Sequence, residues 1–86
     1  MMGEAKNLTL RIDGVPFMIV ANPRYFNLDL QYEVSINGGE AVMFVFDKDL
    51  GRYSATGDAS VLVPDVVDQA IGDKLNGLSL EAQGSD

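Results

Sequence analysis

The sequence predicts an α+β domain: an antiparallel meander sheet of four to five strands with one C-terminal amphipathic helix packed on one face. Apolar and polar residues alternate in several short runs, and turns rich in Gly and Asn separate these runs. A single later segment repeats its apolar residues at helical spacing. The 86 residues suit one domain, 1–86, because so short a chain cannot bury two cores. We expect residues 1–6 and 79–86 to be frayed.

The first predicted element is a hairpin. Alternation over residues 8–12 resumes at Val15, and Asp13-Gly14 between them favours a two-residue type I′ turn. Such a turn fixes the register and places six apolar side chains on one face. The expected pairs are Ile12 with Val15, Leu10 with Phe17, and Leu8 with Ile19. A loop is expected over residues 21–25, because Asn22-Pro23 favours a turn and proline cannot donate to a sheet.

The clearest predicted strand covers residues 28–36, beginning at Leu28, and Asn37-Gly38-Gly39 closes it. A three-residue loop would place two Phe rings in the core, whereas a two-residue loop would expose them and turn Met43 and Val45 inward. We prefer the first register, since each large side chain left in water costs about 1.5–3 kcal/mol. Its expected pairs are Val34 with Val42, Tyr32 with Phe44, and Leu30 with Phe46.

The remaining elements are shorter, apart from the helix. A turn over residues 47–51 leads to a strand over 52–55, with Tyr53 pointing inward, and residues 61–63 are expected to be extended. The helix is predicted from Pro64 to Asn76, because proline suits the first helical position. Gly77 fits a left-handed cap that would end it.

Composition narrows the function. The chain contains no Cys and no His, which removes thiolate chemistry, the usual zinc ligands and the commonest general base. Its net charge of −7, with six scattered cations, disfavours nucleic acid. No segment has the length and apolarity of a signal peptide core or a membrane span. We therefore expect a cytoplasmic, non-catalytic protein that binds no cofactor, nucleic acid or membrane.

Three carboxylates form the alternative hypothesis, a metal- or small-ligand-binding accessory domain. Asp47, Asp49 and Asp58 have the spacing of the first, third and last ligands of an EF-hand loop. The rest of that loop does not match, because Gly51 occupies the place of the fifth-position ligand and Arg52 the place of the required Gly. A charged hairpin turn is the favoured interpretation, so no metal ligand is assigned.

The candidate interaction surface lies on the sheet face turned away from the helix. In the preferred register this face carries Met18, Val20, Met43 and Val45. Contiguous apolar patches are unusual on monomers, so these residues indicate a partner surface, most simply for a second copy of the chain. Two structural explanations compete equally with this one: a different strand register, or a cover formed by the C-terminal tail or the loop at Pro23.

Overall fold

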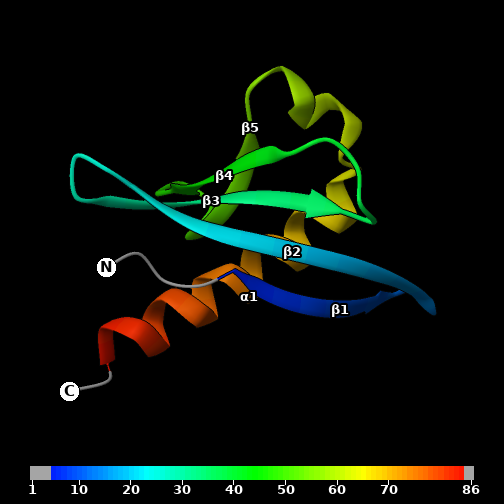
Figure 1. The fold of residues 1–86 in the computed structure, drawn as a ribbon, viewed down its shortest axis with the longest axis horizontal. Helices are drawn as coiled ribbons and strands as arrows, with labels where there is room; N and C mark the ends of the chain where they lie inside the picture. Colours follow the sequence, from blue (N-terminus) through cyan, green and yellow to red (C-terminus); the bar gives the residue numbers. More distant parts are fainter. Residues whose placement is uncertain (1–4, 85–86) are drawn as a thin grey trace.

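The computed structural model describes residues 5–84, which form a five-stranded antiparallel sheet followed by a short 3-10 helix and one α-helix (Figure 1). The sheet order follows the chain, β1-β2-β3-β4-β5, so the predicted α+β meander with a C-terminal helix is confirmed. Residues 1–4 and 85–86 lie outside the described part, and fraying of the ends stays a prediction. The elements are β1 (Lys6–Ile12), β2 (Val15–Phe26), β3 (Asp29–Ile36), β4 (Val42–Asp47), β5 (Arg52–Thr56), η1 (Asp58–Leu62) and α1 (Asp65–Gly84).

The first hairpin has the predicted register. Ile12 pairs with Val15, Leu10 with Phe17, and Leu8 with Ile19. The two residues of the turn, Asp13 and Gly14, both have positive φ (52° and 80°), as a type I′ turn requires. The turn chemistry therefore fixes which side chains of both strands face the core.

The loop predicted over residues 21–25 is wrong, because β2 continues without a break to Phe26. Pairing between β1 and β2 ends at Lys6 and Ala21, while β2 and β3 stay paired from Ile19 to Phe26. Every second residue of β2 from Val15 onward directs its backbone N–H and C=O groups toward β1, and Pro23 is one of these residues. The first residue of β1, Lys6, pairs with Ala21, so no residue of β1 lies opposite Pro23. Proline is tolerated at such an open edge because no hydrogen bond between strands requires a donor there.

The two strands therefore form an arm beyond the end of β1, which reaches out at the left of Figure 1. Asn27 and Leu28 make the turn at its tip, with φ of 50° and 74°. The prediction that the strand begins at Leu28 is wrong: β3 begins at Asp29, and the Leu28 side chain is 96% exposed. We call residues 22–31 the arm.

The preferred register of the next pair of strands is confirmed for Val34 with Val42 and Tyr32 with Phe44. Phe44 is fully buried, as predicted. Pairing does not continue to Leu30 and Phe46; there the Leu30 carbonyl oxygen accepts a hydrogen bond from the Tyr53 hydroxyl at 3.1 Å. Phe46 packs edge-on against the Tyr53 ring, with 5.6 Å between ring centroids, but remains 45% exposed. Only one of the two rings is thus a core residue.

Two predictions about the C-terminal part are wrong. Residues 61 and 62 belong to the 3-10 helix η1 and are not extended. Helix α1 continues through Gly77 to Gly84 and does not end at Asn76. A glycine inside a helix costs only about 1 kcal/mol, and the residues that follow it include the good helix formers Leu78, Leu80 and Glu81. Gly77 is therefore an interior residue of the helix and not its cap.

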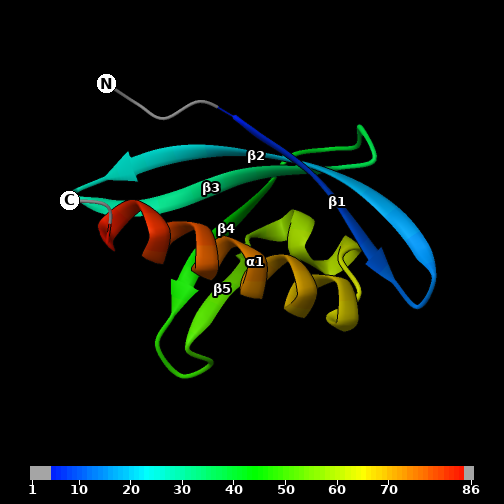
Figure 2. The same cartoon turned by 90° about the horizontal axis from the view of Figure 1, so that it is seen from below.

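Helix α1 lies along β5 and, less extensively, along β1, on one side of the twisted sheet (Figure 2). Its buried residues Val67, Ile71 and Leu75 lie on the side that packs against the sheet, with Gly72 also buried. The core is a single cluster to which all five strands and the helix contribute: Ile12, Ile19, Ala21, Tyr32, Val34, Val42, Phe44, Tyr53, Val63, Val67, Ile71 and Leu75.

Candidate interaction surfaces

The four residues of the predicted surface alternate with core residues of β2 and β4. Ile19 and Phe44 are fully buried, which places their neighbours on the opposite face of the sheet. Met18 is 66% exposed, whereas Val20, Met43 and Val45 are half-buried. Only Met18 therefore offers most of its side chain to solvent.

Polar side chains of β3 run between the two apolar pairs. Val20 pairs with Ser35, and Met43 pairs with Glu33. The Glu33 carboxylate accepts a hydrogen bond from Arg24 Nη2 at 2.8 Å, which holds this ion pair across the same face. The structure therefore brings Met18 near Val20 and Met43 near Val45, but a charged strip separates one pair from the other.

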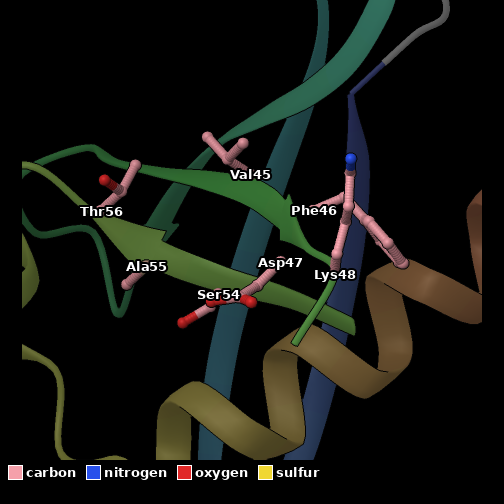
Figure 3. A pocket seen from close by; sticks show the side chains of 7 residues that line it. All are labelled: Val45, Phe46, Asp47, Lys48, Ser54, Ala55 and Thr56. Atoms are coloured by element: carbon pink, nitrogen blue, oxygen red, sulfur yellow. The ribbon is translucent and has the colours of Figure 1, made fainter. Parts of the chain in front are cut away.

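A shallow hollow of about 350 Å³ lies at the end of the β4–β5 hairpin. Figure 3 shows Lys48 pointing away from Asp47 and Ser54. The Ser54 hydroxyl donates to Asp68 Oδ2 at 3.1 Å, so it already has a structural partner. Nothing in this arrangement couples an acid to a base. The hollow is lined by Val45, Phe46, Asp47, Lys48, Ser54, Ala55 and Thr56.

The three aspartates of the alternative hypothesis do not form a cluster. Asp47 Oδ1 accepts the backbone N–H groups of Asp49 at 2.9 Å and Leu50 at 3.3 Å, the pattern of a side chain that shapes a turn. Asp58 begins η1, after β5 has ended. Among residues 5–78, whose side chains the structure describes, no three acidic side chains come together in a way that could hold a metal ion. The observed geometry is that of the charged turn.

Asp68 is the most connected carboxylate of the described chain. It accepts hydrogen bonds from the Ala55 N–H at 2.9 Å and the Ser54 hydroxyl, and its Oδ1 lies 3.8 Å from Arg52 Nη1. All these partners belong to β5, whose outer edge would otherwise present unpaired backbone groups. This cluster fastens α1 to β5, and we assign it a structural role.

Sequence reasoning missed the tip of the arm, which carries Leu28, the most exposed large apolar side chain of the described residues. Tyr25 and Phe26 are 56% and 54% exposed, beside Leu28 at 96%. A signal was present, because Asn27 tolerates the left-handed backbone that a two-residue turn needs. Because Pro23 was expected to end the strand, the hairpin between β2 and β3 was not predicted. Tyr25 and Phe26 are consecutive in β2, so their side chains point to opposite faces of the arm. We call Tyr25, Phe26 and Leu28 together the tip cluster, after their shared position at the end of the arm.

No family model, curated protein or solved structure matches the chain. Within residues 5–84 no helix is both long and apolar enough to cross a membrane.

Proposed function

We propose that this protein is a non-catalytic interaction module that binds a protein partner through the tip cluster. The proposal rests on the strained backbone and the exposure of Leu28. Its φ of 74° belongs to the left-handed region, where type I′ turns normally have Gly, Asn or Asp. A non-glycine residue held in such a sparsely populated conformation costs on the order of 1–3 kcal/mol.

The exposure of Leu28 leaves this strain without compensation. Its side chain is almost entirely in water, so it contributes nothing to the core that would offset the strain. Glycine at this position would relieve the strain. A residue that harms folding and is nevertheless present at a protruding tip favours a role in recognition.

The neighbours of Leu28 suit a protein contact. Aromatic residues are enriched among the side chains that dominate binding energy, and Tyr25 and Phe26 flank the turn. The backbone edges of the arm are less available, since Pro23 lacks an N–H and the Leu30 carbonyl is taken by Tyr53. The arm therefore offers side chains more than strand pairing.

Charge and composition support the choice of partner class. A net charge of −7 opposes nucleic acids and anionic lipid surfaces. The lack of His and Cys leaves the chain without the commonest general base and without a thiol nucleophile. The contact through Met18, Val20, Met43 and Val45 stays a prediction beside this one, and Met43→Glu would test it.

The experiment places a photo-cross-linking amino acid at position 28 and, as a matched control, at position 61. Val61 is also apolar and 84% exposed, but it lies in η1. Cross-linking in the source cells identifies a partner, which is then purified for direct binding measurements. Leu28→Gly is expected to weaken binding about tenfold or more, which corresponds to about 1.4 kcal/mol.

Val61→Ser is expected to bind the purified partner like the unmodified protein. The proposal fails if Leu28→Gly binds with unchanged affinity, or if both positions cross-link to the same proteins with equal yield. A circular dichroism spectrum shows that each variant is folded.

A further inference from the structure

The outer edge of β1 is open. Because Ile12 and Val15 close a two-residue turn, the N–H and C=O groups of Leu8 and Leu10 point toward β2. Those of Asn7, Thr9 and Arg11 then point away from the sheet. In the part of the chain that the structure describes, no other strand borders the outer side of β1 and no backbone hydrogen bond from another element reaches these groups.

The opposite edge of the sheet is treated differently. Helix α1 covers β5, where Asp68 accepts the Ala55 N–H at 2.9 Å and Gly72 lies directly against the Tyr53 carbonyl group. Edge strands are commonly protected by proline, a bulge or charged side chains. Strand β1 has no proline and pairs without a bulge, and its two charged residues, Lys6 and Arg11, lie toward its ends, so its centre is a straight edge suited to a further strand.

The sequence of β1 is self-complementary about Thr9. In an antiparallel pair of two β1 strands centred on Thr9, each residue meets the one equally far on the other side. Thr9 would face Thr9 of the second copy, Leu8 would face its Leu10, and Asn7 would face its Arg11. No charge meets a like charge, and Thr-Thr and apolar cross-strand pairs are favourable.

We propose that two copies of this chain associate through their β1 edges, forming one continuous antiparallel sheet about a two-fold axis at Thr9. The outward N–H and C=O groups of Asn7, Thr9 and Arg11 then bond to the second copy. This contact is separate from the tip cluster, so either proposal can fail alone.

The packing beside β1 also favours a second strand. Leu8 and Leu10 are only half-buried, as is Leu78 of α1, and all three pack against the core cluster. In Figure 2 β1 lies in front of the other strands, with α1 beside it. A strand added to β1 would cover Leu8 and Leu10 with the matching leucines of the second copy, which removes apolar surface from water.

The register also keeps the charged side chains of the edge apart. The protein as a whole is acidic, but the only charged residues of β1 are Lys6 and Arg11. In the two-fold pair no cation lies directly opposite another, because Lys6 would face Ile12 and Arg11 would face Asn7 of the second copy. Asn7 can accept a hydrogen bond from the Arg11 that would lie opposite it.

The test substitutes Thr9, whose side chain is exposed and should tolerate change. Thr9→Lys puts two ammonium groups opposite each other at the two-fold axis, and Thr9→Glu puts two carboxylates there. Sedimentation equilibrium across micromolar to millimolar protein should show the native chain approaching twice its mass of 9.3 kDa. Each variant alone should dimerise about tenfold more weakly or worse, because like charges opposite each other destabilise a sheet.

An equimolar mixture of Thr9→Lys and Thr9→Glu should restore the double mass as a heterodimer. Amide exchange gives an independent signature: protection of Asn7, Thr9 and Arg11 should rise with concentration, while Leu8 and Leu10 are protected at all concentrations. Leu28→Gly should leave the mass unchanged.

Three results would overturn the proposal. The native chain could remain at 9.3 kDa at millimolar concentration. The mixture of oppositely charged variants could stay monomeric although each is folded. Alternatively, Met43→Glu could dissociate a native dimer that Thr9→Lys leaves intact, which would assign the contact to the sheet face.

Discussion

The backbone of Gly72 in α1 lies directly against the carbonyl group of Tyr53 in β5. A Cβ atom at position 72 would collide with the Tyr53 carbonyl oxygen and would also meet Arg52 Nη1 at 2.9 Å. Only glycine allows the helix to lie this close to the strand edge. The distance between α1 and the sheet is therefore set by backbone against backbone.

Two glycines of α1 give opposite predictions for the same substitution. Gly72→Ala should lower the free energy of unfolding by about 2–3 kcal/mol, because the strand backbone cannot move aside without disturbing the core. Gly77 has no atom within 4 Å of where its Cβ would lie, so Gly77→Ala should raise stability by about 0.5–1 kcal/mol. Urea denaturation of both variants measures the difference, and equal effects would refute the close packing.

Two ion pairs of different burial should differ in their contribution. Asp68→Ala leaves the Ala55 N–H and the Arg52 guanidinium without their acceptor, and should cost about 2–3 kcal/mol of unfolding free energy. Glu33→Ala breaks a shorter but exposed ion pair with Arg24 and should cost less than about 1 kcal/mol. Thermal and urea denaturation provide the comparison, and a larger loss for Glu33→Ala would contradict the assignment of Asp68 as the fastening residue.

Leu28→Gly should make the isolated domain more stable. Relief of the left-handed strain on the order of 1–3 kcal/mol exceeds the entropy that glycine adds to the unfolded chain, about 0.5–1 kcal/mol. We expect a higher midpoint of thermal unfolding, whereas Val61→Ser, the matched exposed control, should leave it nearly unchanged. A lower midpoint for Leu28→Gly would mean that the leucine stabilises the fold and needs no functional explanation.

Calcium should cause no saturable, selective change at Asp47, Asp49 and Asp58. The Asp47 carboxylate already accepts two backbone N–H groups, and the three side chains are not gathered into one site. A calcium titration followed by two-dimensional NMR checks this residue by residue. Shifts confined to these aspartates and saturating at millimolar calcium would revive the ligand-binding hypothesis.

Local turn chemistry made the first hairpin and the register at Phe44 predictable. Asp13-Gly14 favours a two-residue loop, and that loop length then fixes every pair of β1 and β2. The cost of exposing aromatic rings selected the pairing of Tyr32 with Phe44. In both hairpins a short turn and the strands beside it determine the register.

The arm and the end of α1 depended on information that is not local. Pro23 is tolerated because the last pair between β1 and β2 is Lys6 with Ala21, two residues before the proline. The sequence of β2 alone does not show where β1 begins. Gly77 has the residue type of a helix cap, yet the chain beyond it continues as helix. The tip cluster was missed because Leu28 fits an alternating strand pattern, while only the pairing of Phe26 with Asp29 assigns it to a turn.

The position of α1 at the end of the order of elements affects how the protein is made. While a ribosome is still translating, the five strands can pair with their sequence neighbours, but the outer side of β5 stays unprotected until the helix follows. Fragments truncated before Asp65 should consequently be prone to precipitate, because both edge strands, β1 and β5, would then be uncovered.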